Sequence, residues 1–214
     1  LIADMDSTMI GQECVDELAD VAGVGPRVAA ITARAMNGEI DFDGALRERV
    51  GLLKGLEVGV IDRVYRERIT MTPGGAELIA TMKSFGAHAA LVSGGFTAFT
   101  ERVAAQLGFD DHQANELLVR DGYLTGEVLE PILGREAKVA ALEVLIDRLG
   151  LASDEVMAVG DGANDLGMIQ RAGAGVALHA KPSVAVQAGI RINFGDLTAL
   201  LYLQGVPRDQ FVSP

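Results

Sequence analysis

Short apolar runs alternate along most of the chain with stretches in which apolar residues recur at helical spacing. The runs are interpreted as buried strands at residues 1–3, 87–92, 156–159, 175–178 and 190–192. A helix is predicted to start at Pro73, with Thr72 as its N-cap. Its buried face is predicted to carry Leu78, Ile79, Met82 and Phe85. A second helix is predicted over residues 137–149, ending at Gly150. The alternation favours an α/β protein with a mainly parallel, Rossmann-like sheet that is covered by helices on both faces.

Residues 13–70 interrupt this alternation. They contain three successive helical patterns, at residues 15–22, 28–36 and 42–53, and no strand pattern. An all-helical insert after the first strand would lie over the carboxyl edge of the sheet, where open α/β folds bind their ligands. We therefore predict a catalytic core formed by residues 1–12 and 71–214, with a small helical cap domain at 13–70. A hairpin is also predicted at residues 118–124, around the Asp121-Gly122 pair.

Charge and composition narrow the classes of partner. The 214 residues carry 18 Lys and Arg against 30 Asp and Glu, a net charge of −12. Clustered basic charge is needed to bind a polyphosphate or an anionic membrane surface, so neither nucleic acid nor a membrane is expected as a partner. The longest stretch without a charged residue, 84–100, is broken by Gly86 and by the Ser93-Gly94-Gly95 sequence, which argues against a membrane span.

Two further features concern the cellular location of the protein and its natural N-terminus. Its single cysteine, Cys14, lies on the apolar side of a predicted helix, where it is expected to pack, and the absence of a second cysteine is consistent with a cytoplasmic location. The chain begins inside an apolar run without an initiator Met, so the natural protein is expected to extend further upstream.

The first strand is followed directly by two carboxylates, in the sequence Asp4-Met5-Asp6-Ser7-Thr8. Residues two apart point the same way in an extended chain, so Asp4 and Asp6 are expected to face one site. Such a pair can bind a hard cation or divide the roles of nucleophile and general acid. Taken alone, the same residues are also typical of a solvated turn or a helix cap.

A second acidic loop, from Gly160 to Asp165, follows the strand at 156–159 and contains Asp161, Asn164 and Asp165. Two strands that each end in a doubly acidic loop would bring four carboxylates to one edge of the sheet. Four carboxylates repel one another unless a cation lies among them. The pattern therefore predicts a Mg²⁺ site, because Mg²⁺ favours carboxylate and phosphate oxygens.

Two weaker signals concern phosphate. The Ser93-Gly94-Gly95 sequence ends the strand at 87–92 and leads into a helix, where a hydroxyl and free amides could bind a phosphate group. By itself it is more typical of a flexible turn. Lys138 begins the helix at 137–149, and most lysines at such positions are solvated.

Together, the order of DxDST, SGG, Lys138 and GDGAND resembles the haloacid dehalogenase superfamily of aspartyl-phosphate phosphatases, over nearly the whole chain. Within it, the resemblance extends to the branch that hydrolyses O-phospho-L-serine in serine biosynthesis. It implies that Asp4 is the nucleophile and that Asp6 protonates the leaving hydroxyl and later activates water. It also implies that Asp4, the backbone carbonyl of Asp6 and Asp161 hold Mg²⁺, with Asp165 supporting them.

The resemblance assigns the remaining site residues to the substrate. Ser93, the Gly94 amide and Lys138 would bind phosphate, with Asn164 close to the phosphate or the attacking water. In the insert, Glu13 would bind the substrate ammonium and Arg49 its carboxylate. Met36 and Phe42 would form an apolar lid.

Other functions stay open at this stage. The alternatives are another small-molecule phosphatase or phosphotransferase of the superfamily, a non-catalytic sensor of a phosphorylated ligand, and the phosphorylation domain of a cation pump. The pump would need a membrane region, and a sensor would not need both Asp4 and Asp6. His88, His112 and His179 are scattered and are expected to be structural or superficial. A homodimer is possible.

Overall fold

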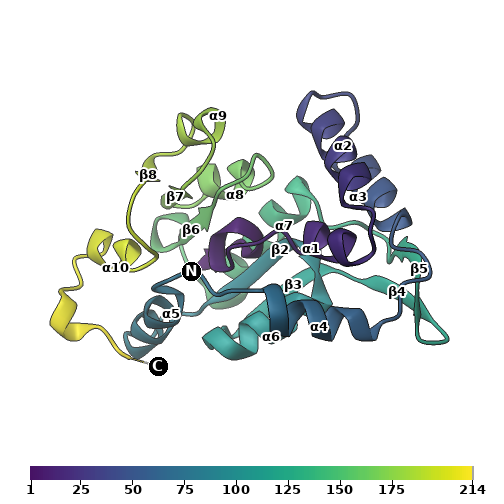
Figure 1. The fold of residues 1–214 in the computed structure, drawn as a ribbon. Helices are drawn as coiled ribbons and strands as arrows, with labels where there is room; N and C mark the ends of the chain where they lie inside the picture. Colours follow the sequence, from purple (N-terminus) through teal and green to yellow (C-terminus); the bar gives the residue numbers. More distant parts are fainter. Residues whose placement is uncertain (214) are drawn as a thin grey trace.

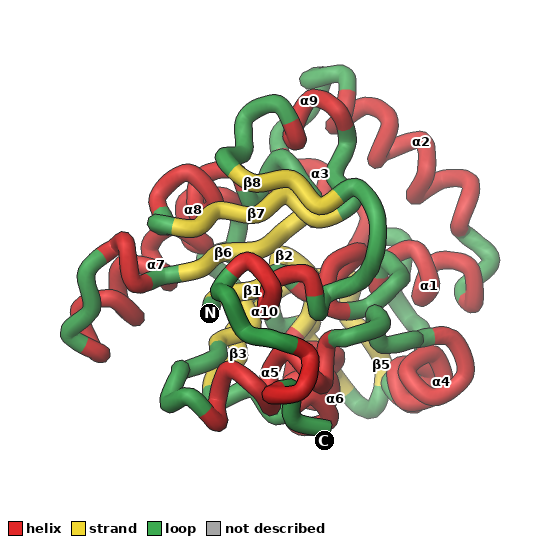
Figure 2. The backbone as a smooth tube through the Cα atoms, turned by 90° about the vertical axis from the view of Figure 1, so that its left-hand side faces the viewer, coloured by secondary structure: helices red, strands yellow, loops and turns green. Residues whose placement is uncertain are grey.

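A six-stranded parallel sheet forms the centre of the molecule in this computed structural model, which describes residues 1–213. The strands lie in the order β3-β2-β1-β6-β7-β8 (Figures 1 and 2). Their bounds are β1 Ile2–Ala3, β2 Ala90–Phe96, β3 Asp111–Asn115, β6 Met157–Gly160, β7 Ala174–Leu178 and β8 Ile190–Ile192. The parallel α/β fold expected from the alternation of strands and helices is confirmed.

Helices cover both faces of this sheet (Figure 2). From residue 75 onward the α-helices are α5 Gly75–Ser84, α6 Thr97–Leu107, α7 Arg135–Leu149, α8 Leu166–Arg171, α9 Pro182–Ala185 and α10 Ala199–Leu203. Ile2 of β1 packs in one apolar cluster with Leu142 of α7 and Met168 of α8. Ala3, which points the opposite way, belongs to a second cluster with Leu78 of α5 and Phe99 of α6. The central strand is therefore buried on both sides.

The boundaries of several elements differ from the expectation. β2 begins at Ala90 and continues through the Ser-Gly-Gly sequence to Phe96. β3 was not predicted, because its polar sequence, DHQAN, suits an edge strand that has one neighbour only. The predicted start of the helix at Pro73 is wrong, since α5 begins at Gly75 after a turn in which Gly74 has the left-handed φ of 80°. Phe85, expected on the buried face of this helix, is 61% exposed.

Between β1 and α5 the short π-helical turn Met5–Met9 is followed by four α-helices rather than the three expected. They are α1 Cys14–Val21, α2 Gly25–Met36, α3 Phe42–Gly51 and α4 Gly59–Arg68. The fourth was missed although Val60, Ile61 and Val64 form its buried face. The apolar side chains of these helices join the same cluster as those of α5 and α6. The division of the chain into a core and a cap at 13–70 stays a prediction.

The expected hairpin is present as β4 Leu117–Arg120 and β5 Tyr123–Val128. Asp121 and Gly122 both have positive φ, 52° and 84°, as a two-residue turn requires. The hairpin lies beside α3 (Figure 1), and the Gly55 amide that follows this helix donates to the Leu124 carbonyl at 2.8 Å. No helix within the described residues is long and apolar enough to cross a membrane.

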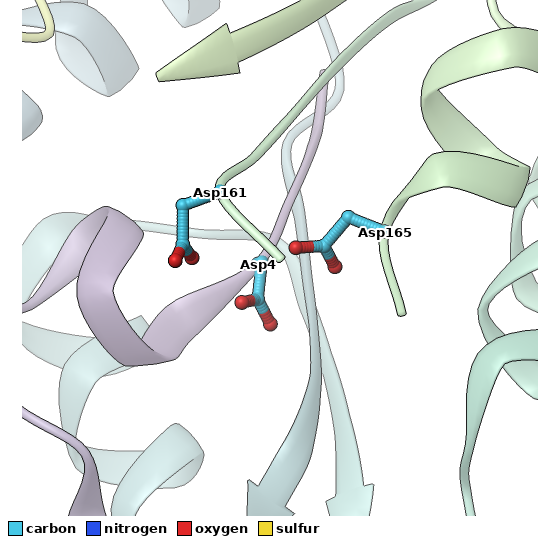
Figure 3. Close-up of side chains that lie close together, drawn as sticks. All are labelled: Asp4, Asp161 and Asp165. Atoms are coloured by element: carbon cyan, nitrogen blue, oxygen red, sulfur yellow. The ribbon is translucent and has the colours of Figure 1, made fainter. Parts of the chain in front are cut away.

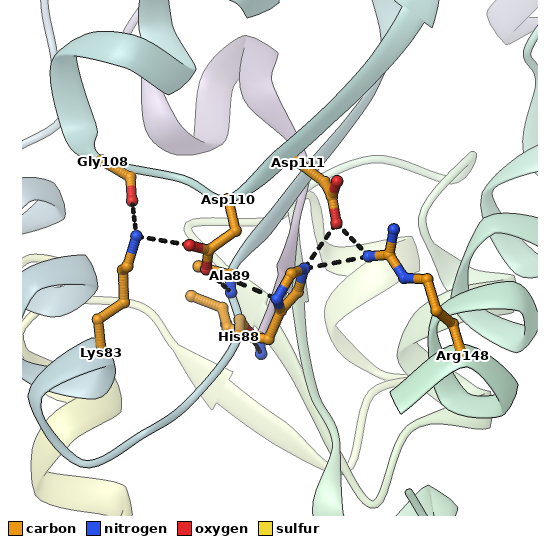
Figure 4. Close-up of polar contacts among 8 residues, drawn as sticks. Lys83, His88, Ala89, Gly108, Asp110, Asp111 and Arg148 are labelled. Atoms are coloured by element: carbon orange, nitrogen blue, oxygen red, sulfur yellow. Dashed lines mark hydrogen bonds and ion pairs between the residues drawn. The ribbon is translucent and has the colours of Figure 1, made fainter. Parts of the chain in front are cut away.

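A polar network joins helix ends to the amino ends of β2 and β3 (Figure 4). Lys83 of α5 donates to Asp110 at 2.6 Å, and Arg148 of α7 donates to Asp111. Asp111 also pairs with His88 Nε2 at 2.6 Å. The hydrogen bond from Arg148 is the main reason why the pKa of Asp111 lies below its usual value. His88 is thus structural, as expected, and this network lies at the edge of the sheet opposite the acidic loops.

Candidate active site

Three carboxylates meet at the carboxyl edge of the sheet. Asp4 follows β1 and Asp161 follows β6, which are neighbouring strands on either side of the point where the strand order reverses. Asp165 lies at the end of the same loop as Asp161, just before α8. One oxygen of each lies within 4.8 Å of the others, and Figure 3 shows the three side chains converging. The sequence prediction that the two acidic loops meet is confirmed for Asp4, Asp161 and Asp165, whereas Asp6, the fourth carboxylate expected there, is not part of this cluster.

Lys138 is fully buried beside this cluster. Its Nζ lies 2.5 Å from an oxygen of Asp4 and 2.5 Å from an oxygen of Asp165. Lys138 is therefore not a solvated lysine of the kind that is common at helix starts. Burial alone would lower the pKa of Lys138, but the charges of Asp165 and Asp4 outweigh it and hold the pKa above its usual range. The side chain is a buried ammonium that ties α7 to the acidic cluster.

One ammonium does not balance three carboxylates. Burial and the charge of Asp165 raise the pKa of Asp4 well above its usual value. The pKa of Asp161 is raised to about 6 by burial and by the charges of Asp165 and Glu13. The donor set consists of carboxylate oxygens only, which suits a hard divalent cation. The residues present therefore fit a metal ion by both geometry and charge.

Two neighbouring groups orient the carboxylates. The buried hydroxyl of Thr8 donates to Asp161 Oδ1 at 3.1 Å. The Gly162 amide donates to Asp165 Oδ2 at 2.9 Å, so both oxygens of Asp165 have protein partners. Asp165 thus contacts Lys138 and the backbone of its own loop. This arrangement suits a residue that supports the metal-binding carboxylates without holding the metal itself. Thr8 was not singled out from the sequence, although its place in the DMDST motif was a signal.

Asp6 lies next to the cluster rather than in it. The backbone amide of Cys14 donates to its Oδ1 at 3.1 Å. Burial and the nearby Glu13 raise the pKa of Asp6 to about 7. A Cβ atom at Gly95 would lie 2.5 Å from Asp6 Oδ2, so any larger residue there would displace the Asp6 carboxylate. A carboxyl group that titrates near neutral pH can both donate and accept a proton.

The Ser-Gly-Gly segment lies at the same edge of the sheet as the acidic loops and faces both of them. Ser93 is buried, and its Oγ accepts a hydrogen bond from the Gly95 amide at 2.9 Å, which leaves the hydroxyl proton for another acceptor. A Cβ at Gly94 would lie 2.9 Å from Phe42 Cζ and 3.8 Å from Asn164 Nδ2. The segment does not stand at a helix N-terminus as expected, because α6 begins only at Thr97.

Charged residues of α1 and α3 face the same region. The Ser7 hydroxyl donates to Glu13 Oε1 at 2.7 Å. Burial lowers the pKa of Arg49, while the charges of Asp16 and Glu13 oppose that shift. Glu13 and Arg49 are thus brought into electrostatic range of each other and of Asp6. Asp16, which sequence reasoning missed, is another charge facing Arg49.

The two residues expected to form a lid lie in different environments. Phe42, at the start of α3, is half-buried and lies against both Gly94 and Gly134. Met36, at the end of α2, is 63% exposed, and its sulfur lies 3.6 Å from Lys181 Nζ. The structure thus places Phe42 against the Ser-Gly-Gly segment and Met36 at the surface, beside Lys181.

Comparisons with known proteins match the chain to one family of hydrolases. Residues 1–170 match the sequence profile of the haloacid dehalogenase-like hydrolases. The chain is 47% identical over 203 residues to the phosphoserine phosphatase of Haemophilus influenzae, covering 95% of this chain and 64% of that protein. It is 48% identical over 205 residues to the phosphoserine phosphatase of Polaromonas sp., covering 94% of this chain and 87% of that protein. A solved structure described as a substrate-bound phosphoserine phosphatase complex superposes with a TM-score of 0.88 at 40% identity, covering 94% of this chain and 96% of that one.

Proposed function

The chain belongs to the haloacid dehalogenase-like hydrolase family, and from this membership and its acidic site we propose that it is a phosphoserine phosphatase. It would hydrolyse O-phospho-L-serine to L-serine and phosphate, as the last step of serine biosynthesis. The observation that carries the proposal is the arrangement of Asp4, beside the buried Lys138, and Asp6, two residues further along. The names of its relatives at 47% and 48% identity support the choice of substrate.

The reaction would proceed in two displacements. A carboxylate oxygen of Asp4 attacks phosphorus, and the serine oxygen leaves with a proton from the carboxyl of Asp6. Asp6, now ionised, takes a proton from water, which attacks the aspartyl phosphate and releases inorganic phosphate. Because the intermediate is covalent, one difficult displacement is divided into two easier ones.

Electrostatic stabilisation of the transition state would supply most of the rate enhancement. The ammonium of Lys138 and the hydroxyl of Ser93 would balance the charge of the phosphoryl oxygens. Asp4, Asp161 and the backbone carbonyl of Asp6 would hold Mg²⁺, with Asp165 in support. When bound, Mg²⁺ would supply positive charge that offsets the repulsion between the Asp4 carboxylate and the phosphate dianion.

The serine end of the substrate would lie between α1 and α3. Glu13 would bind the ammonium, and Arg49 would bind the carboxylate through its planar fork. Phe42 would exclude water above Gly94, and the exposed Met36 would have to move to complete the lid. A cytoplasmic location, in line with the single cysteine, and a homodimer are further parts of this proposal.

Two alternative functions remain, one with a different substrate and one without catalysis. Another small-molecule phosphatase of the family would use the same Asp4 and Asp6 with a different group facing Glu13 and Arg49. A non-catalytic phospho-ligand sensor would bind phosphate without turnover. A phosphate-release screen over small phosphomonoesters, O-phosphoserine included, separates these three functions.

Removal of the metal is expected to abolish activity reversibly. Activity should disappear in EDTA and return with Mg²⁺, and calorimetry should detect one Mg²⁺ bound per chain. Ca²⁺ should inhibit, because its looser geometry and larger number of ligands would disturb in-line attack. Full activity in exhaustively chelated buffer would contradict the assignment.

Replacing Arg49 by Ala should change specificity more than chemistry. Removing one partner of a buried charge pair costs roughly 2–5 kcal/mol, so kcat/KM for O-phosphoserine should fall roughly 30- to 5,000-fold. Phosphoethanolamine, which has the ammonium and no carboxylate, should be far less affected. Arg47→Ala is the matched control, because Arg47 lies on the same helix in an exposed pair with Glu130. An equal loss on both substrates would make Arg49 structural.

A further inference from the structure

The phosphate-binding segment interrupts the ladder between β2 and β3. Val92 pairs with Gln113 and Phe96 with Asn115, so three residues of β2, 93–95, face a single residue of β3. The backbone groups of these three residues therefore lose their regular partners on β3. A carbonyl that is largely shielded from water is costly without a partner, and another group has to supply the missing hydrogen bond.

The side chain of Asn115 supplies it. Asn115 is 3% exposed, and its Nδ2 donates to the Gly94 carbonyl at 2.9 Å. The Gly94–Gly95 peptide is planar and trans, so its N–H points away from its carbonyl. That N–H donates to Ser93 Oγ at 2.9 Å. Asn115 thus holds the peptide in the orientation that leaves the proton of the Ser93 hydroxyl free for the substrate.

The same amide holds a second segment. Nδ2 of Asn115 also donates to the Leu133 carbonyl at 3.2 Å, and its Oδ1 accepts from the Leu133 amide at 2.7 Å. Leu133 immediately precedes Gly134, whose carbonyl accepts the Lys138 amide at 3.1 Å in the first turn of α7. The two glycines reached through these contacts, Gly94 and Gly134, are also the two that Phe42 covers.

We propose that Asn115 is a positioning residue which holds the Ser93–Gly95 segment and the start of α7 at a fixed separation, so that Ser93 and Lys138 meet the same phosphoryl group. The residue lies on the far side of Gly94 from the acidic cluster and acts through the backbone. The inference rests on the proposed function only in that these two residues bind phosphate, and it is independent of the choice of substrate.

The test compares Asn115→Asp and Asn115→Leu with the control Gln113→Glu. The Asp variant keeps an acceptor for the Leu133 amide and loses both donors, and the Leu variant loses all three hydrogen bonds. Gln113 is exposed on the same strand, so its variant makes the same amide-to-carboxylate change away from the site. The readouts are the affinity for inorganic phosphate by calorimetry with Mg²⁺, kcat and KM, and the melting temperature.

Both Asn115 variants should bind inorganic phosphate roughly 10- to 100-fold more weakly, as expected when the partly buried Gly94 carbonyl and the buried Leu133 carbonyl both lose their donor. kcat/KM should fall by a similar factor on O-phosphoserine and on phosphoethanolamine, so the ratio between the two substrates stays unchanged, unlike that of Arg49→Ala. Mg²⁺ affinity should also stay unchanged. Folded variants that bind phosphate as the wild type does would overturn the proposal.

If the Asn115 variants do not fold, the proposal can be tested on the wild-type protein by hydrogen exchange. Inorganic phosphate should slow hydrogen exchange of the Gly95 amide and also of the Leu133 amide, because Asn115 connects the two. Slower exchange at Gly95 with no change at Leu133 would overturn the proposal. Failure to hydrolyse O-phosphoserine, with other phosphomonoesters accepted, would contradict the proposed substrate alone and leave the phosphate titration to decide the role of Asn115.

Discussion

Replacing Asp4 by Asn is expected to abolish phosphatase activity, by on the order of 10⁴-fold or more, as is typical of a lost nucleophile. The amide cannot accept the phosphoryl group, so no phosphoenzyme should form. The loss should not come from unfolding. Because burial and Asp165 raise the pKa of Asp4, its ionised form costs stability, and a neutral amide should leave the metal-free protein as stable or more stable. Turnover on O-phosphoserine, mass spectrometry of acid-quenched protein and thermal melting test these three points.

Asp147→Asn is the matched control for this variant. Asp147 is exposed on α7, so the same chemical change there should leave turnover and phosphoenzyme formation intact. Phosphorylation at position 4 of the Asp4→Asn variant, or activity above about 1% of the wild type, would rule out Asp4 as the nucleophile.

Replacing Lys138 by Met is expected to reduce both stability and activity. Met fills a similar volume, but Asp4 and Asp165 would then be buried without their ammonium. Breaking a buried pair in this way costs about 3–5 kcal/mol of unfolding free energy. Because the folded-state pKa of Lys138 is raised, its contribution is fully present below the usual lysine pKa and is lost only at more alkaline pH, so neutral buffer shows the whole effect. Turnover should fall about 10²- to 10³-fold, through lost stabilisation of phosphoryl charge.

Lys83→Met provides the comparison. Lys83 also pairs with an aspartate, Asp110 at 2.6 Å, but the pair is partly exposed at the other edge of the sheet (Figure 4). Its loss should cost less than about 1 kcal/mol and leave turnover unchanged. Mg²⁺ should raise the melting temperature of the Lys138 variant more than that of the wild type, because positive charge would return to the carboxylates. Equal stability losses in the two lysine variants would contradict a special role for Lys138.

Most of the fold and the acidic site were accessible from the sequence, because they depend on local patterns. Apolar runs separated by amphipathic stretches predict a parallel sheet, and the carboxyl ends of parallel strands share one edge. The placement of Asp4, Asp161 and Asp165 at one edge was therefore expected from the sequence, and the pairing of β1 with β6 in the structure brings them together. The turn at Asp121-Gly122 was equally local, since both positions need positive φ.

Other features depend on contacts between distant segments. Lys138 has the local pattern of a solvated lysine, and only the packing of α7 against β2 places it between Asp4 and Asp165, 134 and 27 residues away. β3 has no apolar alternation because it is an edge strand, so Asn115 drew no attention. The hydrogen bonds of Asn115 to Gly94 and Leu133 require three segments to meet. The sequence by itself determined which chemical groups gather at the carboxyl edge of the sheet, because the parallel direction of the strands follows from the pattern, whereas the strand order came from the structure. Tertiary structure alone decided which charges are buried and which backbone groups lack a ladder partner, because burial and pairing depend on neighbours that the chain brings together only when it folds.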